Sequence, residues 1–480
     1  MITTEDLYSL YAACGYRVTT DSRAVCGGEI FFALKGENFD GNAYASKAIA
    51  AGASWAVVEA SSGCLDLMPQ DKFIKVEDPF RTLQELAIYH RRKLDIPVIG
   101  LTGTNGKTTT KELMAAVLRE KFEVTATQGN LNNDIGVPLS LLNMTPATQV
   151  AVIEMGASHP DDIAKLVTVS QPSYGLITNV GKAHLLGFGS FEGVKAAKGE
   201  LYKWLGSHEG SVIFLNQDDP DLVGMARREP CHVFGYGLGY QGVSLLAATA
   251  ADPFLGLRFP DGTEVHTRLV GAYNATNVLA ALAVGEYFGV PRSAAIRAIE
   301  GYVPANQRSQ MQKTDTNTLI IDAYNANPSS MAVAIGNLEG MTHRSKVALL
   351  GEMRELGSDS LPEHKAIVRR LLGSGLKFYL VGEEFRKAIV DCVSEGSLTG
   401  VRLGVAAALP EGLKNPMNAR TEAGQAIPLN ASLTPLCPFK GWFPTSADLA
   451  LELGTHPVKD SVILVKGSRG IQMEKVLPVL

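Results

Sequence analysis

The chain has few of the residues and patterns that would place it outside the ordinary globular proteins. It contains 6 cysteines in 480 residues, none in a CxxC pair, so we expect neither a zinc site nor a disulfide framework. The formal net charge is −5, so no overall positive charge favours nucleic acid. No apolar run approaches the roughly 18 residues that a membrane-spanning helix needs. We therefore expect no nucleic-acid partner and no membrane insertion.

A targeting signal is also missing from the start of the chain. Residues Met1–Asp6 contain no cationic region followed by an apolar run, which a secretory signal would require. The sequence thus predicts a cytoplasmic protein. The hydrophobic fraction of 46% and the charged fraction of 19% are typical of a packed globular chain, and the length predicts about three domains.

The most informative pattern that is present runs from Val98 to Thr110 and reads as a buried strand, a glycine-rich turn and a helix start. Such a turn can cradle a phosphate, because its amides and the positive end of the helix dipole face the anion. Lys107 can reach the outer phosphates, and the Thr108 hydroxyl can hold Mg²⁺. The motif GxxxxGK[ST] needs a glycine where this chain has Leu101, so an ordinary glycine-rich turn is the alternative. The residues expected to contact the nucleotide here are Gly103, Thr104, Asn105, Gly106, Lys107, Thr108 and Thr109.

Apolar strands alternate with helices along most of the chain, which predicts an α/β fold with doubly wound parallel sheets. We expect three domains: a small one at 1–80, a central one with the phosphate loop at 81–303, and a Rossmann-like one at 304–480. Residues 395–445, rich in Gly, Pro, Asn and Thr, predict an irregular insertion.

Hydrophobic periodicity and breaker residues predict the individual elements. Residues 230–270 are expected to be β-rich. The predicted strands are 29–34, 55–59, 150–154, 174–179, 211–215, 318–322, 347–350, 378–381 and 462–465. The predicted helices are 43–51, 111–120, 192–205 and 274–288, and three more that start at Pro79 (capped by Asp78), Pro328 and Pro362.

Three ionisable residues follow or flank predicted central strands, where open parallel sheets place their ligands. Glu154 ends a strand and can bind Mg²⁺, or else pair with a lysine. His184 lies in the loop after the next strand and is either a metal ligand or a solvated histidine. Lys198 follows on a helix, and on its own reads as a solvated lysine.

Polar loops elsewhere offer weaker candidates. The loop Gly129–Pro138 is dense in Asn, which suits sugar or phosphate recognition as well as an ordinary turn. Asp322 ends a strand and can accept from ribose hydroxyls, or begin a turn and helix cap with the Asn residues that follow. Lys466–Arg469 forms a cationic turn that either binds a carboxylate or is solvated.

Together these segments resemble the Mur ligase family, which builds the peptide stem of bacterial peptidoglycan in the cytoplasm. Thr102–Thr108 matches that family's own form of the phosphate loop, which accounts for Leu101. The resemblance implies a three-domain α/β fold: a UDP-binding domain, an ATP-binding domain and a C-terminal ligase domain. Further segments that carry it are Asp21–Arg23, Phe31–Gly36, Gly129–Asn133, Gly271–Asn277, Asp322–Ser330 and Gly351–Gly357.

The resemblance also implies roles for single residues. ATP and two Mg²⁺ ions are expected, with Thr108, Glu154 and His184 as metal ligands. Lys198 matches the lysine that many members carry as a carbamate formed with CO₂, which helps to hold the second ion. Lys107, Glu154, His184 and Lys198 are thus the expected catalytic set.

The remaining implied roles concern the bound substrates. Asn274 is expected to contact adenine, Arg308 a phosphate and Asp322 the ribose. Tyr273 and Asn42 stand where relatives often have His. The residues expected to bind the other substrates are Ser22, Arg23, Lys35, Gly36, Asp40, Asn130, Asn325, Asn327, Lys466 and Arg469.

Within the family, Asp322–Ser330 and Gly351–Gly357 resemble the ligase that adds D-alanyl-D-alanine to UDP-N-acetylmuramoyl-tripeptide through an acyl phosphate. The resemblance implies those two substrates and a monomer. One alternative is the ligase that adds the third stem residue, although its Asn-Pro-Arg segment is absent. Others are a folate polyglutamate ligase, which would not need Asp21–Arg23, and a catalytically silent nucleotide-binding scaffold.

Overall fold

The computed structural model describes residues 2–36, 39–62, 70–247, 253–304, 308–395 and 438–480. The chain forms two compact units. The first unit comprises Met1–Val180, Lys195–Gln241 and Thr276–Ile299, and the second comprises Gly181–Val194, Gly242–Ala275 and Glu300–Leu480. Among the described residues, no helix has both the length and the apolar character that a bilayer crossing needs.

The first unit opens with a four-stranded sheet in the order β1-β2-β3-β4. All its strand pairs are parallel. The predicted strand at 55–59 is confirmed, and the strand predicted at 29–34 is shorter than expected. The helix predicted at 43–51 is divided between a short 3₁₀ turn and an α-helix. The strands are β1 (Val18–Thr19), β2 (Ile30–Phe32), β3 (Trp55–Glu59) and β4 (Phe73–Val76), and the helices are α1 (Thr4–Ala13), η1 (Gly41–Tyr44), α2 (Ala45–Ala50) and η3 (Gln70–Lys72).

Helix α3 (Pro79–Leu94) links this sheet to the central one. Its predicted start is confirmed: the Asp78 side chain accepts from the Phe80 and Arg81 amides, at 2.8 and 3.2 Å. Pro79 fits the first helical position because its missing N–H is not needed there.

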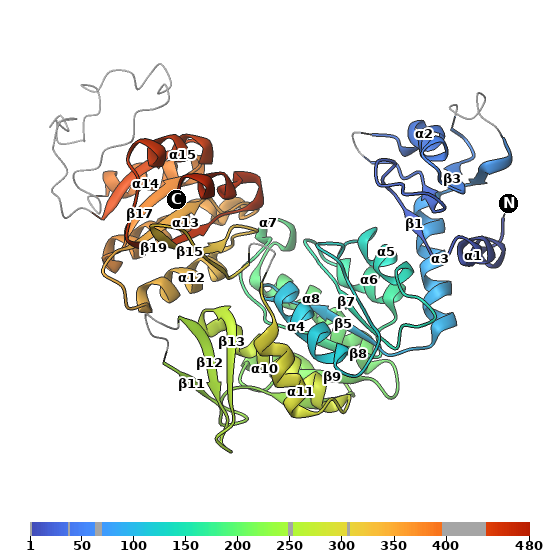
Figure 1. The fold of residues 1–480 in the computed structure, drawn as a ribbon, viewed down its shortest axis with the longest axis horizontal. Helices are drawn as coiled ribbons and strands as arrows, with labels where there is room; N and C mark the ends of the chain where they lie inside the picture. Colours follow the sequence, from blue (N-terminus) through green and yellow to red (C-terminus); the bar gives the residue numbers. More distant parts are fainter. Residues whose placement is uncertain (1, 37–38, 63–69, 248–252, 305–307, 396–437) are drawn as a thin grey trace. The chain divides into compact units, whose positions relative to one another are not determined.

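The central sheet has six parallel strands in the order β10-β9-β8-β5-β7-β6. Figure 1 labels four of them, β5, β7, β8 and β9. The strands β5, β7 and β9 are buried along their whole length, as expected for a parallel sheet covered on both faces. The strands are β5 (Val98–Thr102), β6 (Val124–Ala126), β7 (Val150–Glu154), β8 (Tyr174–Ile177), β9 (Val212–Asn216) and β10 (His232–Tyr236). The helices of this part are α4 (Lys107–Arg119), α5 (Gly136–Leu142), α6 (Asp162–Ser170), α8 (Phe191–Gly206), α9 (Pro220–Ala226), α10 (Ala275–Tyr287) and α11 (Arg292–Gly301).

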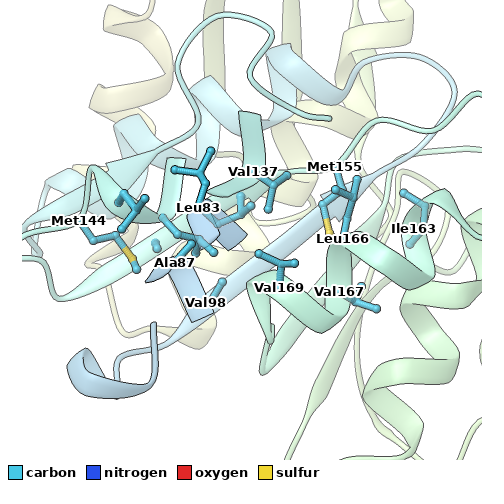
Figure 2. Close-up of a cluster of buried hydrophobic side chains, with 14 of the residues drawn as sticks. Leu83, Ala87, Val98, Val137, Met144, Met155, Ile163, Leu166, Val167 and Val169 are labelled. Atoms are coloured by element: carbon cyan, nitrogen blue, oxygen red, sulfur yellow. The ribbon is translucent and has the colours of Figure 1, made fainter. Parts of the chain in front are cut away.

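One hydrophobic cluster joins the two sheets of the first unit. It includes Leu7 of α1 and Ile30 of β2 as well as residues of the central sheet. Figure 2 shows Leu83 of α3, Val137 of α5 and Leu166 of α6 within this cluster. The positions of β5 and its loop are therefore fixed by a core that continues through α3 into the N-terminal sheet.

The second unit contains two further sheets. One is the antiparallel sheet β11-β12-β13, which confirms the β-rich character of 230–270. The other has the order β14-β15-β19-β16-β17-β18, in which only β14 pairs antiparallel. The strands are β11 (Ser244–Leu246), β12 (Phe254–Arg258), β13 (Glu264–Val270), β14 (Gln310–Lys313), β15 (Asn317–Asp322), β16 (Lys346–Gly351), β17 (Lys377–Val381), β18 (Phe439–Phe443) and β19 (Ser461–Lys466). The helices are α7 (Leu185–Phe188), η4 (Ala272–Asn274), α12 (Pro328–Gly340), η5 (Gly357–Asp359), α13 (Ser360–Ser374), α14 (Glu383–Ser394), α15 (Ser446–Thr455), η8 (Arg469–Ile471) and η9 (Met473–Val479).

The expected irregular insertion at 395–445 needs a correction. Its last part forms β18, which pairs parallel with β17. The residues of β18 alternate between buried and half-buried, with Phe439, Gly441 and Phe443 inward. This short period-2 pattern is hidden in the sequence by the glycine- and proline-rich residues around it. The rest of the expected insertion, 396–437, lies outside the described residues.

Candidate active site

The predicted phosphate loop lies where the strand order of the central sheet reverses. The chain forms β5, then places β6 and β7 on one side of it and β8, β9 and β10 on the other. Open parallel sheets bind ligands outside the carboxyl ends of their strands at such a point. The loop connects the end of β5 at Thr102 to the start of α4 at Lys107, so it occupies this position.

The backbone of the loop requires its two glycines. Gly103 has φ 145°, and a Cβ there would lie 1.9 Å from the Thr178 hydroxyl oxygen. Gly106 has φ 79°, and a Cβ there would lie 2.8 Å from the Asn277 amide oxygen. Side chains are disfavoured at positive φ. The glycines therefore let the backbone come close both to its neighbours and to a bound anion.

Side chains from the end of β8 and from α10 hold the loop. The Thr178 hydroxyl and the Asn179 amide donate to the Asn105 carbonyl, at 2.6 and 2.9 Å. The Asn105 N–H donates to the Asn179 side-chain oxygen at 3.0 Å. The Thr110 hydroxyl donates to the Asn277 side-chain oxygen at 3.1 Å. None of these supporting contacts was predicted, because each joins residues at least 73 positions apart.

The Lys107 ammonium is folded back over the loop. It donates to the carbonyls of Gly103 and Thr104, at 2.7 and 3.2 Å. Its positive charge therefore lies directly beside the amides of the loop. This is where a phosphate cradle needs charge to neutralise an oxyanion.

Glu154, at the end of β7, is only 1% exposed. One carboxylate oxygen accepts from the Asn132 amide at 2.8 Å and from the Thr108 hydroxyl at 3.3 Å. The other oxygen is buried and has no hydrogen-bond partner, and the lysine pair that the sequence allowed is not formed among the described residues. An unpaired buried carboxylate oxygen is costly unless a ligand or cation meets it. Asn132 was missed in the sequence, where its neighbour Asn130, which is exposed here, was preferred.

Lys198, in α8, is not the solvated lysine that the sequence alone suggested. It is 2% exposed. Burial lowers its pKa to about 7, and the nearby positive charge of Lys107 adds to this effect. The structure thus brings Lys107, Thr108, Glu154 and Lys198 together in the first unit.

His184 belongs to the second unit. It has φ 50° and precedes α7. Its Nδ1 lies against the Glu355 carboxylate, and the Leu186 N–H donates to the Glu355 carbonyl at 3.4 Å. Nearby, Lys182 pairs with Glu363 at 2.8 Å. His184 is therefore held in place by a carboxylate and is not a freely solvated histidine.

The carboxyl edge of the C-terminal sheet carries Asp322 and Lys466. These residues are opposite each other in the parallel β15–β19 register. The Lys466 ammonium lies 2.5 Å from the Asp322 carboxylate and donates to the Asn325 carbonyl at 3.2 Å. The Lys466 side chain is 1% exposed, whereas Arg469 is exposed. The predicted cationic turn therefore divides into a buried partner of Asp322 and one accessible guanidinium.

The other residues predicted to contact ATP or the amine substrate also lie in the second unit. Asn274 is buried, and its amide donates to the Val270 carbonyl at 2.9 Å. The Arg308 guanidinium stacks 3.8 Å from the centre of the Tyr324 ring. The Asn327 side chain accepts from the Ser330 N–H at 2.8 Å and caps α12, which confirms the helix-cap alternative for this residue.

The residues predicted to bind the uridine nucleotide lie in loops of the N-terminal sheet. The Arg23 guanidinium pairs with Asp21 at 2.7 Å, and the hydrogen bond to Arg23 lowers the pKa of Asp21 to about 2. Asp40 accepts from the Asn42 N–H at 2.9 Å, which lowers the pKa of the Asp40 carboxyl. The predicted set is half-buried or exposed: Ser22, Arg23, Lys35, Gly36 and Asp40.

Comparison with known proteins covers all three predicted domains. Three family models match: the Mur ligase family catalytic domain at residues 16–91, the Mur ligase middle domain at 101–285, and the Mur ligase glutamate ligase domain at 307–427. The middle-domain match contains the phosphate loop, Glu154 and Lys198.

Curated relatives are similar over most of their length. A UDP-N-acetylmuramoyl-tripeptide–D-alanyl-D-alanine ligase from Bacillus subtilis is 36% identical over 355 residues, covering 72% of this chain and 76% of the relative. The enzyme of the same name from Escherichia coli is 34% identical over 368 residues, covering 75% and 79%.

Solved structures have the same overall fold. MurF from Acinetobacter baumannii is 29% identical with a TM-score of 0.74, over 96% of this chain and 92% of that one. MurF from Thermotoga maritima, solved in complex with ADP, is 26% identical with a TM-score of 0.75, over 96% of each chain. With the three family models matched in chain order and relatives above 30% identity across most of their length, the chain belongs to the Mur ligase family.

Proposed function

We propose that this chain is the ATP-dependent amide ligase that joins D-alanyl-D-alanine to UDP-N-acetylmuramoyl-tripeptide, with release of ADP and phosphate. The names of the curated relatives support this substrate pair, and the ADP complex of the Thermotoga maritima relative supports the nucleotide. The observation that carries the proposal is the glycine loop at the switch point of the central sheet, with Lys107 over it. Residues 1–80 bind the UDP moiety, 81–303 bind ATP, and 304–480 complete the ligase site.

The first chemical step is activation of the peptide carboxylate. A carboxylate oxygen attacks the γ-phosphorus of ATP, the bond from that phosphorus to the β–γ bridging oxygen breaks, and ADP leaves. Both reactants are anions, so the main barrier is electrostatic. Lys107 and the loop amides around Gly106 lower it by meeting the charge that develops on the transferred group.

The second step forms the amide bond. The amine of D-alanyl-D-alanine, after losing a proton, attacks the acyl carbon of the acyl phosphate, and phosphate leaves from the tetrahedral intermediate. Arg308 and Asp322 in the second unit contact the phosphate and the ribose of the nucleotide. Water must be excluded while the acyl phosphate exists, so movement of the C-terminal domain is expected to gate turnover.

Magnesium fits the chemistry of the first unit. The unpaired Glu154 oxygen and the adjacent Thr108 hydroxyl are oxygen donors of the kind that Mg²⁺ prefers. Among the described residues, no group of three or more His, Cys, Asp or Glu side chains forms a ready-made metal site, so Glu154 and Thr108 are the groups of the first unit that would hold the ion. When bound, the metal neutralises phosphate charge. His184 is proposed as a ligand of a second ion.

Carbamylation of Lys198 is the most specific part of the proposal. Only a neutral amine adds to CO₂, and a lysine with a pKa of about 7 is substantially neutral near physiological pH. In this reaction the amine nitrogen bonds to the carbon of CO₂ and a proton is released to solvent. The product places an anion beside the Lys107 ammonium, where a protonated Lys198 would be repelled, and it would supply oxygen donors for a metal.

Donor selectivity tests the proposed function most simply. Phosphate release and product mass are measured with the two UDP-muramoyl-tripeptides that carry Lys or diaminopimelate, each without an amine donor and with D-alanyl-D-alanine, L-Lys or diaminopimelate. We expect turnover only with a tripeptide together with D-alanyl-D-alanine. The UDP-muramoyl-dipeptide is the control acceptor. Its turnover with L-Lys or diaminopimelate, at a rate equal to that of the tripeptides with D-alanyl-D-alanine, would contradict the proposal in favour of the ligase for the third residue. We expect the protein itself to be a monomer in the cytoplasm.

A further inference from the structure

Tyr324 brings two arginines together in the second unit. The guanidinium carbon of Arg308 lies 3.8 Å from the centre of the Tyr324 ring, and that of Arg469 lies 5.1 Å from the same centre. The three residues come from separate segments: Arg308 precedes β14, Tyr324 follows β15, and Arg469 begins η8. The two guanidinium carbons are therefore no further apart than the sum of those two distances.

The charge around this aromatic ring is unbalanced. Among the described residues, no carboxylate lies within ion-pair distance of either guanidinium. The nearby carboxylate, Asp322, is already paired with Lys466 at 2.5 Å. The Nε atom of Arg308 is buried and has no hydrogen-bond partner. Two like charges thus lie against one ring, and part of the hydrogen-bonding capacity of Arg308 is unused.

The aromatic ring explains how the two arginines can remain there. The negative face of an aromatic ring attracts a guanidinium, so Tyr324 offsets part of the repulsion that would otherwise separate Arg308 from Arg469. The guanidinium is planar and suited to paired hydrogen bonds with a carboxylate or phosphate. A single anionic group could therefore satisfy both arginines.

We propose that Tyr324 is a positioning residue, whose ring holds Arg308 and Arg469 together as one site for an oxyanion of the ligation substrates. This inference rests on the proposed function, since it takes the anion to be either a phosphate of the nucleotide or the carboxylate of the amine donor. The ring, and not the hydroxyl group, does the positioning, because the contacts are made to the ring centre.

The test compares Tyr324→Leu with Tyr324→Phe. Phenylalanine keeps the aromatic face and leucine removes it at similar hydrophobicity. We expect Tyr324→Leu to raise KM for one of the two anionic substrates by about tenfold, corresponding to one lost favourable contact, and Tyr324→Phe to stay within about twofold of the wild type. Equal KM values in all three proteins would overturn the proposal. An equal rise in KM in both variants would also overturn it.

A second variant keeps the test valid if Tyr324→Leu folds poorly. Arg469 is exposed, so Arg469→Gln should leave the fold intact and raise the same KM. In the double variant Tyr324→Leu/Arg469→Gln, the effects should be clearly less than additive, because both changes disrupt one site. Fully additive effects would show that the ring and Arg469 act independently, and the proposal would fail.

Two further measurements identify the anion. If it is a phosphate, Tyr324→Leu should weaken the binding of ADP in calorimetry and leave KM for D-alanyl-D-alanine unchanged. If it is the dipeptide carboxylate, ADP binding should be unchanged, and D-alanyl-D-alaninamide, which lacks that carboxylate, should be equally poor with wild type and variant. If neither quantity changes, the proposal is wrong. Binding of ADP is independent of ligation, so failure of the proposed function would be recognised separately by the absence of amide product from the wild type.

Discussion

The central and C-terminal sheets end in two carboxyl edges that share one architecture and differ in how their charges are balanced. At the central edge, the Lys107 ammonium lies over the glycine loop, and Glu154 keeps a buried oxygen without a partner. At the C-terminal edge, Asp322 and Lys466 neutralise each other across β15 and β19. The central edge therefore has charged groups that a ligand can neutralise. At the C-terminal edge, Asp322 and Lys466 need no ligand to neutralise them. Sheet topology places a site, whereas the local balance of charge decides which residues of that edge remain available to a ligand.

The strongest test of the central edge is removal of the Lys107 ammonium. We expect Lys107→Ala to lower kcat by about 10³-fold or more, because it removes charge stabilisation of the transferred group, on the order of 4 kcal/mol. Phosphate release under saturating substrates measures it. Lys165→Ala, an exposed lysine on α6, is the matched control and should leave kcat unchanged. A loss below tenfold would mean that the loop amides work without Lys107.

The C-terminal edge should show its largest effect in stability. Asp322→Asn leaves the Lys466 ammonium, which is 1% exposed, without its counter-charge, and we expect a loss of about 3–5 kcal/mol in the free energy of unfolding. Urea unfolding measures this loss. The double variant Asp322→Asn/Lys466→Met removes both charges and should recover most of it. No recovery in the double variant would show that the pair does not explain the stability of this edge.

Gly103, the first glycine of the phosphate loop, gives a test with a smaller expected effect. Gly103→Ala places a Cβ 1.9 Å from the Thr178 hydroxyl at a positive φ, and we expect a loss of about 1–3 kcal/mol in stability together with weaker ATP binding. Thermal unfolding and nucleotide titration measure the two effects. Gly224→Ala, in α9 with nothing within 4 Å of the added Cβ, should be neutral or slightly stabilising. An equally stable Gly103→Ala protein would refute the packing described for the loop.

The smallest predicted effect is a pH dependence of the second unit. His364 is buried, donates from Nδ1 to the Ser360 carbonyl at 2.7 Å and accepts from the Met353 N–H at 3.0 Å. Burial lowers its pKa below the usual value of 6.5. The unfolded chain therefore takes up a proton before the folded one, so stability should fall as the pH drops below about 6.5.

Variants at this histidine isolate the effect. Urea unfolding is measured at pH 7.5, 6.5 and 5.5. The free energy of unfolding should fall less steeply toward acid pH in His364→Gln than in the wild type. The control is the exposed His456, which directly follows α15. His456→Gln should keep the wild-type dependence of the free energy of unfolding on pH. Identical slopes for the wild type and His364→Gln would exclude His364 as the cause.

The same comparison shows what could be predicted from the sequence. The buried strands at 55–59 and 150–154 were predicted with their observed bounds, because short apolar runs between turn residues have few alternatives. The phosphate loop was predicted because all of its residues are consecutive. Residues that depend on tertiary contacts were not: Asn132 reaches Glu154 and Thr178 reaches Asn105 only after the strands are assembled.

Two lysines show which alternatives the residue pattern alone could not decide. Lys198 reads as a solvated lysine, because the sequence does not reveal that α8 buries it near Lys107. The turn at Lys466 could either bind a carboxylate or be solvated, because the pairing of Lys466 with Asp322 depends on the register of two strands that are 144 residues apart. Burial of a charge is a property of the assembled sheet, so a local pattern cannot predict it.

The central claim is that the loop holds ATP for attack by a carboxylate and not by water. It can be tested by labelling the terminal carboxylate of the UDP-muramoyl-tripeptide with ¹⁸O and analysing the released phosphate by mass spectrometry after ligation to D-alanyl-D-alanine. The account predicts one ¹⁸O atom in the phosphate for each amide bond formed, because the carboxylate oxygen that attacks phosphorus leaves with it. Phosphate without ¹⁸O, released alongside amide product, would contradict the account.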